Sequence, residues 1–313
     1  MQTFDAAATR AALPFDALVP ALRAAFASPA TVVPTRHVHA LGQGTSSPGT
    51  VLVMPAWNDA LLGIKTINIF PANTARGLPG LHATYVLYDA TTGAPLAMMD
   101  GDEITARRTA AAAALAASFL ARADARRLLV LGSGRVARLL PAAFASVRAI
   151  DQVRVWNHRP AGAEALAAQW RAQGVDAQAV ADLPAAVRAA DIVSCATLAT
   201  APLVQGAWLT PGTHLDLIGS FTPQMREADA ACFEGARVAI DTEEALAKAG
   251  DLLDARAAGA LAAGSAPDTL AQLCRGERAG RQNAQERTVF KAVGSALEDL
   301  AAATRVWQQA PRG

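Results

Sequence analysis

Residues Arg127 to Ala137 read Arg-Leu-Leu-Val-Leu-Gly-Ser-Gly-Arg-Val-Ala, and this stretch decides the fold. The apolar run before Gly132 is typical of a buried parallel strand, and the alanine- and leucine-rich residues after Gly134 are typical of a helix. Gly132, Gly134 and Ala137 stand at the G-x-G-x-x-G/A positions, where small residues permit a tight turn, the approach of a pyrophosphate and close helix packing. We therefore predict a dinucleotide site here. The alternative is a tight strand-to-helix turn without a ligand.

From about residue 126, apolar runs alternate with helical patterns. The apolar runs predict strands at Arg127–Leu131, Gln152–Trp156, Asp191–Cys195, His214–Ile218 and Arg237–Ile240. The patterns between them predict helices that include Ala163–Gln173 and Leu183–Ala190. Pro141 predicts a kink or a late start of the first helix, because proline inside a helix costs ~3 kcal/mol. The alternation predicts an α/β, Rossmann-type doubly wound parallel sheet.

The first 120 residues show no glycine phosphate loop and a different pattern. Strands are predicted at Val51–Met54, Leu61–Phe70 and Ala83–Tyr88, with helices at Thr109–Arg122 and Ser295–Gln308. We predict an α+β substrate-binding domain of residues 1–120, joined by a C-terminal helix in residues 290–313. Residues 121–289 then form the dinucleotide-binding domain.

The composition limits the classes of partner. The chain has 313 residues, 52% of them hydrophobic and 18% charged, with a formal net charge of +1. A large core is therefore possible and wholesale disorder is not expected. The sequence has no basic tract, its longest low-charge run (Thr109–Leu120) is too short to span a bilayer, and its first residues lack a signal-peptide pattern. We expect no nucleic-acid or membrane partner.

Cysteines and histidines carry little functional signal. Cys195, Cys232 and Cys274 are far apart and form no C-x-x-C pair, so we expect reduced thiols in a cytoplasmic protein. His37 and His39 are close together, but no third ligand stands near them. We expect no metal site.

The end of the second predicted strand indicates which nucleotide is bound. NAD-binding folds place an acidic residue about 20 residues beyond the glycines to hold the ribose. Here the strand Gln152–Trp156 is followed by Asn157, His158 and Arg159, without a carboxylate. Arg159 offers a planar fork that matches a phosphate. We therefore predict NADPH rather than NADH; the alternative for Arg159 is an exposed arginine at a helix start.

Lys65 is the most unusual residue of the first domain. On a strand it shares a face with Leu61, Ile67 and Ile69. A lysine on an apolar face needs a partner or a ligand, because burying an unpaired charge is costly. It is therefore a candidate for binding a carboxylate or transferring a proton. The alternative is a side chain whose ammonium reaches solvent at a sheet edge.

Arg36 and Arg108 are the other cationic candidates. Arg36 lies in Thr-Arg-His-Val-His, and Arg108 directly precedes a threonine and a long alanine-rich segment. For Arg108 the alternative is a solvated residue at a helix start, paired with Asp102 or Glu103.

Several segments together resemble the ornithine cyclodeaminase/μ-crystallin family over nearly the whole chain. They are Gly63–Lys65, Gly77–Pro79, His82–Thr84, Met99–Thr109, Gly132–Gly134, Ile218–Glu227 and Thr288–Asp299. The resemblance implies a two-domain NAD(P)-dependent enzyme that forms a homodimer through its N-terminal domain. It implies that Arg36 and Arg108 bind a substrate carboxylate and that Lys65 is a substrate-binding and catalytic residue.

With the glycine turn, the resemblance also implies a set of cofactor-binding residues. They are Thr84, Arg108, Thr109, Gly132, Ser133, Gly134, Arg135, Val136, Asn157, His158, Arg159, Thr197, Gly219, Val293 and Gly294.

One position departs from the family pattern. Ornithine cyclodeaminase and the archaeal alanine dehydrogenase of the family carry a catalytic aspartate soon after the Ile-Gly of the fifth strand, where this chain has Phe221. Phenylalanine cannot transfer a proton. Asp216 lies upstream on the strand and matches an asparagine of relatives, so we assign it no role. μ-Crystallin also lacks the aspartate and resembles an imine reductase.

These observations favour an NADPH-dependent reductase of small imino acids such as Δ1-pyrroline-2-carboxylate. The second hypothesis is ornithine cyclodeaminase, which releases ammonia and forms proline. An amino-acid dehydrogenase of the alanine type is the third. A hypothesis from another class is a non-enzymatic protein that uses NADPH to bind a small ligand.

Overall fold

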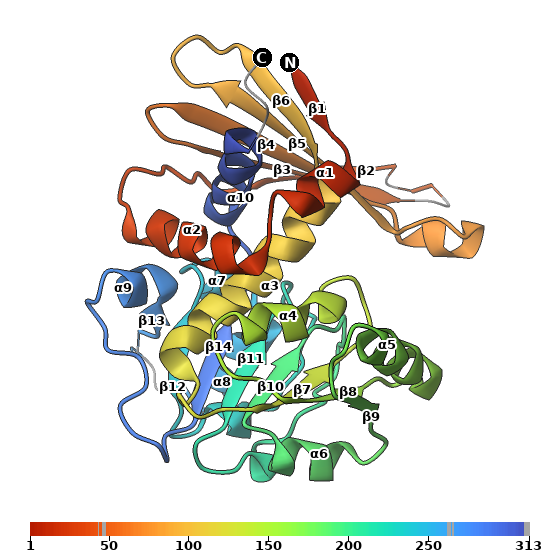
Figure 1. Ribbon diagram of the computed structural model, residues 1–313, viewed down its shortest axis with the longest axis vertical. Helices are drawn as coiled ribbons and strands as arrows, with labels where there is room; N and C mark the ends of the chain where they lie inside the picture. The colour runs from red at the N-terminus through yellow and green to blue at the C-terminus, as the bar shows by residue number, and fades with distance from the viewer. Residues whose placement is uncertain (43, 46–47, 262–263, 265, 310–313) are drawn as a thin grey trace. The chain divides into compact units, whose positions relative to one another are not determined.

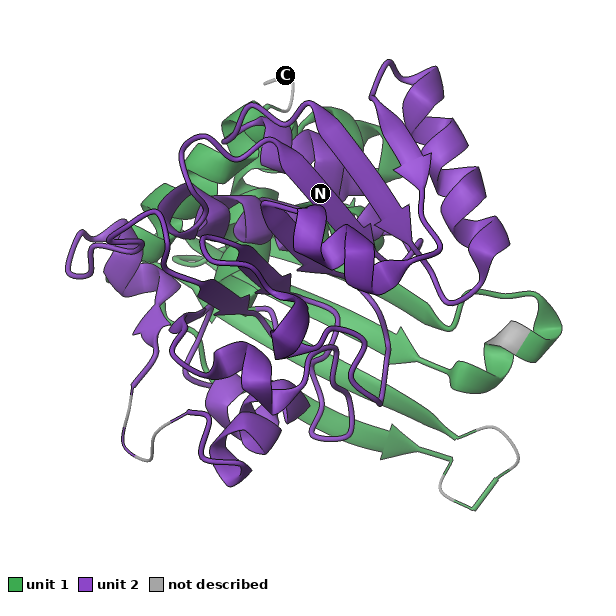
Figure 2. Ribbon diagram, turned by 90° about the horizontal axis from the view of Figure 1, so that it is seen from below, with its two compact units in different colours: residues 1–108, 295–313 green, residues 109–294 purple. Residues whose placement is uncertain are grey.

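The computed structural model contains two sheets of different construction, and each belongs to its own unit of the chain. It describes residues 1–42, 44–45, 48–261, 264 and 266–309. Unit 1 comprises residues 1–108 and 295–313, and unit 2 comprises residues 109–294 (Figure 2). The division after Arg108 falls inside helix α3 (Gly101–Leu120), twelve residues before the predicted boundary at 120.

Unit 1 is built on a sheet of six strands within the described residues, in the order β1-β6-β5-β4-β3-β2. The strands are β1 (Gln2–Phe4), β2 (His37–Leu41), β3 (Gly49–Trp57), β4 (Leu61–Ile69), β5 (Leu81–Asp89) and β6 (Pro95–Asp100). All neighbours are antiparallel except β1 and β6. The other elements are α1 (Ala6–Ala11), α2 (Phe15–Ala27), the 3₁₀ helix η1 (Pro71–Arg76) and α10 (Ala296–Gln308).

Helix α10 returns from the C-terminal end of the chain to pack against α2, β3 and β4 (Figure 1). Its buried residues include Leu300, Ala303 and Val306, which recur at helical spacing along one face. The start of the helix is set by Ser295, whose hydroxyl accepts a hydrogen bond from the Leu297 N–H at 3.2 Å. The last helix of the chain thus completes the core of unit 1.

Unit 2 is built on an all-parallel sheet, with eight strands in the part of the chain that the structure describes. The order is β13-β12-β14-β11-β10-β7-β8-β9, so the direction of strand addition reverses beside β7. The strands are β7 (Arg127–Leu131), β8 (Gln152–Trp156), β9 (Ala177–Ala179), β10 (Ile192–Cys195), β11 (His214–Leu217), β12 (Arg237–Ile240), β13 (Asp268–Thr269) and β14 (Thr288–Lys291). The predicted doubly wound parallel sheet is therefore confirmed.

Helices cover both faces of this sheet, with α4 and α5 on one side and α6 on the other (Figure 1). The α-helices are α4 (Leu140–Ala145), α5 (Pro160–Ala172), α6 (Leu183–Ala189), α7 (Ala245–Lys248), α8 (Gly250–Ala257) and α9 (Leu270–Cys274). The 3₁₀ helices are η2 (Ala137–Leu139), η3 (Gly206–Trp208) and η4 (Ala230–Phe233). The central strands are buried along their length, through residues such as Leu129, Val193 and Leu215, as their apolar runs predict.

Two local expectations have clear outcomes. Pro141 lies in the first turn of α4, after the 3₁₀ turn η2, so the predicted late helix start is confirmed. The helix predicted from Thr109 begins at Gly101, because Asp100 accepts the Glu103 N–H at 2.8 Å and so satisfies a free donor of the first turn. Arg108 consequently lies inside α3 and not before it. Among the described residues, we find no helix with the length and apolar character needed to cross a membrane.

Candidate functional site

The two glycines of the turn after β7 have different surroundings. Gly132 adopts φ = 107°, and its N–H donates to the carbonyl oxygen of Trp156 at 2.9 Å. A Cβ on Gly132 would lie 2.6 Å from the carbonyl oxygen of Ala196. A Cβ on Gly134, in contrast, would meet no described heavy atom within 4 Å. The first glycine is thus required by the turn, whereas the second leaves space beside the backbone for a phosphate.

The end of β8 is tied to this turn. The Asn157 side-chain amide donates to the Ser133 hydroxyl at 3.0 Å. His158 Nδ1 lies 3.1 Å from Asn157 Oδ1, and the Arg159 Nε donates to His158 Nε2 at 3.2 Å. His158 and Arg159 are exposed. Residues 157–159 therefore place polar and cationic groups beside the glycine turn.

Other predicted cofactor-binding residues follow the carboxyl ends of neighbouring strands. Thr197 follows β10, Gly219 follows β11, and Val293 and Gly294 follow β14. The N–H groups of Val293 and Gly294 donate to the Asp241 carboxylate at 2.8 and 2.6 Å. Because carboxyl ends of parallel strands meet at one edge of a sheet, unit 2 brings these residues to the edge that carries the glycine turn.

Four further residues were predicted to bind the cofactor, and they differ in exposure. Arg135 is exposed and Val136 half-buried in the turn that follows Gly134. Thr109 is half-buried in α3. Thr84 is exposed on β5, where alternation puts it on the face opposite to that of its buried neighbour Tyr85.

Unit 1 contains a buried cluster of four charged side chains. The Lys65 Nζ lies 2.6 Å from Asp299 Oδ2, at the start of α10. Arg108 Nε donates to Asp299 Oδ1 at 2.9 Å, and its Nη1 donates to Glu298 Oε2 at 2.7 Å. The exposed fraction of these side chains is 7% for Arg108 and at most 1% for the other three. Asp299 thus joins the two cations that the sequence singles out in this unit.

The charges in this cluster balance, with two cations against two carboxylates. Burial lowers the pKa of Lys65 to about 8, and Arg108 acts in the same direction, while Asp299 and Glu298 oppose the shift. Burial disfavours the ionised form of Asp299, but Lys65 and Arg108 outweigh it and hold its pKa below the usual value. Lys65 is therefore an ammonium at neutral pH that releases its proton more readily than an exposed lysine.

Tyr85 adjoins this cluster and was missed by the sequence reasoning. It is aligned with Lys65 in the β4–β5 register, and its buried hydroxyl has no hydrogen-bond partner among the described residues. A Cβ on Gly63 would lie 1.8 Å from that hydroxyl, so the glycine of the Gly63–Lys65 segment makes room for Tyr85. Burial, with the charge of Asp299, raises the pKa of Tyr85 well above its ordinary value.

The structure decides between the alternatives for the cationic residues. The interpretation of Arg108 as a solvated residue at a helix start is wrong, since its side chain is only 7% exposed and pairs with Glu298 and Asp299 of α10. The alternative in which Lys65 reaches solvent at a sheet edge is also wrong, because the side chain is fully buried on a central strand.

Arg36 is half-buried just before β2. The next residue, His37, is aligned with Val53, which is aligned with Thr66. Arg36 precedes His37 by one residue and is therefore level with Met54 and Lys65, which are aligned with each other. In the order of the strands it lies two strands away from Lys65.

Neither residue near the family's aspartate position provides an exposed acid. Phe221 is 37% exposed in the loop after β11. Asp216 is fully buried in β11, where it accepts a hydrogen bond from Ser194 of the neighbouring strand. Burial raises the pKa of Asp216 to about 7.

Glu298 and Asp299 belong to the segment Thr288–Asp299 that carries the family resemblance, but the sequence alone indicates no role for them. In the sequence they are a pair of acids at the start of an amphipathic helix. Such acids are usually explained by their favourable interaction with the helix dipole. Only the return of α10 to β4 shows that they face Lys65 and Arg108.

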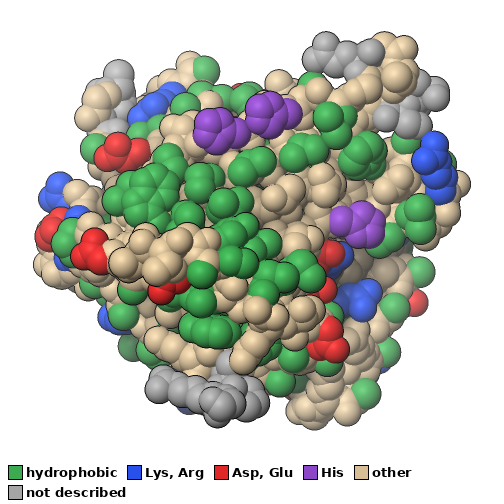
Figure 3. Space-filling model, turned by 90° about the horizontal axis from the view of Figure 1, so that it is seen from above, with side chains coloured by type: hydrophobic (Ala, Val, Ile, Leu, Met, Phe, Trp, Pro, Cys, Tyr) green, Lys and Arg blue, Asp and Glu red, His purple; other side chains and the backbone are tan. Residues whose placement is uncertain are grey.

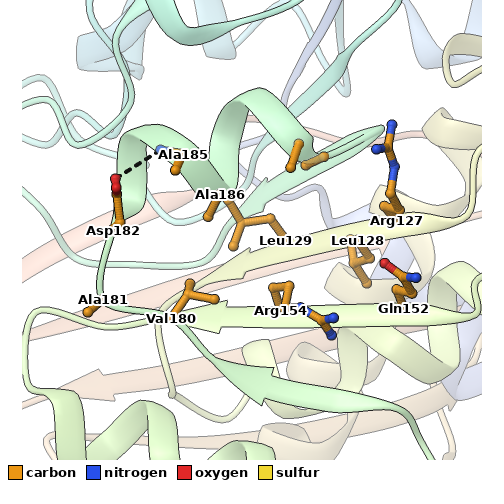
Figure 4. A pocket seen from close by; sticks show the side chains of 12 residues that line it. Arg127, Leu128, Leu129, Gln152, Arg154, Val180, Ala181, Asp182, Ala185 and Ala186 are labelled. Carbon is orange, nitrogen blue, oxygen red and sulfur yellow. Dashed lines mark hydrogen bonds between the residues drawn. The ribbon is translucent and has the colours of Figure 1, made fainter.

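Unit 2 also contains a pocket of about 470 Å³, away from its glycine turn (Figure 4). It lies between α6 and the first residues of β7 and β8, lined among others by Arg127, Leu129 and Ala186. The glycine turn follows the opposite end of β7, so this pocket is not the predicted nucleotide site.

Substitution of the two glycines separates the need for a turn from the need for a ligand. We expect Gly134→Ala to leave the thermal midpoint unchanged but to weaken NADPH binding about tenfold or more, because the new methyl group occupies space beside the backbone where the phosphate approaches. Gly132→Ala should lower stability by about 1–3 kcal/mol, because of its positive φ and the clash with Ala196. Calorimetry and fluorescence titration measure both quantities. Unchanged NADPH affinity in Gly134→Ala would favour a turn without a ligand.

Comparison with known proteins agrees with this construction. The Δ1-pyrroline-2-carboxylate reductase of Paracoccus denitrificans is 42% identical over 82% of this chain and 83% of its own. The ketimine reductase μ-crystallin of Rattus norvegicus is 34% identical over 83% of this chain and 80% of its own. The solved structure of Thermococcus litoralis Δ1-pyrroline-2-carboxylate reductase, in complex with NADH and L-proline, has a TM-score of 0.92 and 30% identity, and covers 98% of this chain and 97% of that one.

The family model described as the ornithine cyclodeaminase/mu-crystallin family matches residues 4–313. The predicted resemblance is confirmed: the chain belongs to the ornithine cyclodeaminase/μ-crystallin family.

Proposed function

We propose that the protein reduces a small imino acid, such as Δ1-pyrroline-2-carboxylate, with NADPH as the hydride donor. The observation that carries this proposal is the buried Asp299 carboxylate, which lies 2.6 Å from the Lys65 Nζ and 2.9 Å from the Arg108 Nε and so holds both cations in one place. An ammonium and a guanidinium thus lie close together. An imino acid needs such a pair, because its carboxylate binds a guanidinium and its nitrogen takes up a proton. Relatives named as reductases of this substrate support the choice.

The residues of unit 1 have distinct tasks in this reaction. Arg36 binds the substrate carboxylate, since a guanidinium matches a carboxylate in a planar fork. Arg108 adds a second positive charge for that carboxylate, in the orientation that its hydrogen bonds to Asp299 and Glu298 fix. Lys65 supplies the proton that the imine nitrogen takes up, because its pKa of about 8 keeps it protonated at neutral pH and lets it release that proton more readily than an exposed lysine does. The nicotinamide group, when bound, supplies the hydride that reaches the imine carbon. One hydride and one proton convert the C=N bond into a CH–NH unit.

The residues of unit 2 have the task of holding the cofactor. Gly132 and Gly134 leave the backbone accessible to the pyrophosphate, and Asn157 braces the turn through Ser133. Arg159, exposed at the end of β8, binds the 2′-phosphate, which is why NADPH is the proposed cofactor.

Phe221 favours reduction of an imine over cyclodeamination of ornithine. Deamination needs a base to remove protons from an amine and to handle water, whereas reduction of an iminium needs less. A phenyl ring performs neither task, and Asp216 is buried within the sheet.

We also propose that the protein forms a homodimer through unit 1. Of the nine large hydrophobic side chains exposed in the described residues, seven belong to unit 1. They include Val38 and Leu41 on the edge strand β2, which are 57% and 42% exposed. Figure 3 shows a face of the molecule on which apolar side chains gather. Such a surface is typical of an interface between subunits.

The direct test measures two reactions of the purified protein. With Δ1-pyrroline-2-carboxylate and NADPH, we expect loss of absorbance at the nicotinamide band and formation of proline. With ornithine and NAD⁺ we expect no ammonia release. Turnover of ornithine without imine reduction would favour ornithine cyclodeaminase over the imine reductase. Tight NADPH binding without hydride transfer to any of a series of imino acids would indicate a ligand-binding protein.

Lys65→Met tests the role of the ammonium in the same assay. We expect turnover to fall by about 10²–10⁴-fold, the usual contribution of a general acid, while NADPH affinity stays the same. In the unaltered protein turnover should decline as the pH rises above about 8, because the Lys65 proton is lost. Lys248→Met, at a lysine paired with Glu244 on α7, is the control and should keep full activity.

Arg159→Asp tests the preference for NADPH. We expect the affinity for NADPH to fall about tenfold or more and that for NADH to change little, because the new carboxylate repels the 2′-phosphate and matches a free ribose. Titration of each nucleotide measures the two dissociation constants, with exposed Arg188→Asp as the control for net charge. Equal losses for the two nucleotides would contradict the phosphate assignment.

A further inference from the structure

Glu227 is a fully buried carboxylate that accepts four hydrogen bonds from two loops. Its Oε1 accepts from the backbone N–H and the hydroxyl of Thr197, at 2.7 and 2.8 Å. Its Oε2 accepts from the N–H groups of Gly219 and Ser220, at 2.8 and 3.3 Å. Thr197 follows β10 and Gly219 follows β11, so one side chain connects the ends of two adjacent strands.

A second buried carboxylate, that of Asp251, binds the backbone of Glu227. Asp251 Oδ1 accepts the N–H groups of Glu227 and Ala228 at 2.7 and 3.0 Å. Asp251 Oδ2 accepts from the Ser220 hydroxyl and lies 3.2 Å from the Lys291 Nζ. Lys291, at the end of β14, also donates to the carbonyl oxygen of Leu217 at 3.0 Å. Glu227 is therefore fixed at both its backbone and its carboxylate.

The loops approach each other so closely that a glycine is required between them. A Cβ on Gly219 would lie 2.1 Å from the carbonyl oxygen of Thr197 and 2.3 Å from Glu227 Oε1. The clamp thus needs a backbone without a side chain at this position, which is one of the positions that the sequence predicts to contact the cofactor.

The position of these loops in the sheet indicates which half of a dinucleotide they meet. Dinucleotides bind across the carboxyl ends of the strands where the strand order reverses, here between β7 and β10. The adenosine ribose is held at the end of the second strand, which in this chain is β8 with Asn157 and Arg159. The loops after β10 and β11 therefore lie on the side of the nicotinamide half.

We propose that Glu227 is a positioning residue that fixes the loops at Thr197 and Gly219 for the nicotinamide half of the cofactor. This inference rests on the proposed function, since it assigns Glu227 to the binding of the same nucleotide. Glu227 takes no part in proton transfer, because its fully buried carboxylate is occupied by four donors from the two loops.

Above its pKa of about 7, Glu227 is a carboxylate, and this form matches its surroundings because it offers only acceptors to four donors. Burial raises the pKa of Glu227 to about 7, and Lys291 opposes this shift. A glutamine of the same length would direct its amide N–H groups at two of the donors, leaving them without an acceptor.

The test compares two ligands in the Glu227→Gln protein. NADPH reports on the whole cofactor, and adenosine 2′,5′-bisphosphate reports on the adenosine half alone. We expect the dissociation constant of NADPH to rise about tenfold, the effect of leaving buried donors unsatisfied, and that of the bisphosphate to change by less than about twofold. Glu164→Gln, at an exposed glutamate on α5, should change neither constant.

Unaltered NADPH affinity in Glu227→Gln, or an equal loss for both ligands, would overturn the inference and leave the proposed function standing. Failure of the unaltered protein to bind either ligand would instead contradict the proposed function. Amide hydrogen exchange of the unaltered protein provides a second measurement that does not depend on the variant's folding. The Thr197 and Gly219 amides should exchange slowly despite their position in loops, and exchange at the rate of exposed loop amides would also overturn the inference.

Discussion

The ion pair between Lys65 and Asp299, shared with Arg108, is the constraint on which the arrangement of unit 1 depends. An unpaired buried charge is strongly destabilising, so a lysine in the centre of a covered sheet requires a carboxylate from elsewhere in the chain. That carboxylate comes from α10, near the opposite end of the sequence, which explains why residues 295–313 belong to the unit formed by residues 1–108. The helix thus supplies both an apolar face for the core and the counter-charges for the candidate site.

Unit 2 also contains buried carboxylates, and these accept hydrogen bonds from the backbone N–H groups of loops. Glu227 and Asp241 accept N–H groups from the loops that follow β10, β11 and β14, where the strands themselves no longer provide partners. Such loops carry the residues that contact a ligand, and they need a fixed geometry to do so. In both units, therefore, acids that do not themselves react set the positions of the groups that are proposed to bind and react.

The sequence predicts those parts of the fold that depend on local pattern. The apolar run before Gly132, the glycine turn and the alternation of strands with helices predict the parallel sheet, and Pro141 indicates the late helix start. The face shared by Lys65 and Ile67 predicts that the lysine is buried, but its partner could not be identified. Asp299 lies 234 positions later in the chain, and only tertiary packing brings it to Lys65. Short strands such as β1 and β9 were not predicted, because three residues are too few to show an alternating pattern of apolar and polar side chains.

The protonation of Lys65 can be measured directly, because the chain has only three lysines, at positions 65, 248 and 291. In protein labelled with ¹⁵N at the lysine side chains, the Nζ resonances can be followed by NMR as the pH is raised, with the Lys65→Met protein used for assignment. We predict that the Lys65 ammonium titrates near pH 8, and that Asp299→Asn shifts its pKa further down because a favourable charge is removed. A Lys65 that titrates like an exposed lysine, above about pH 10, or one that does not respond to Asp299→Asn, would contradict the central role of this ion pair.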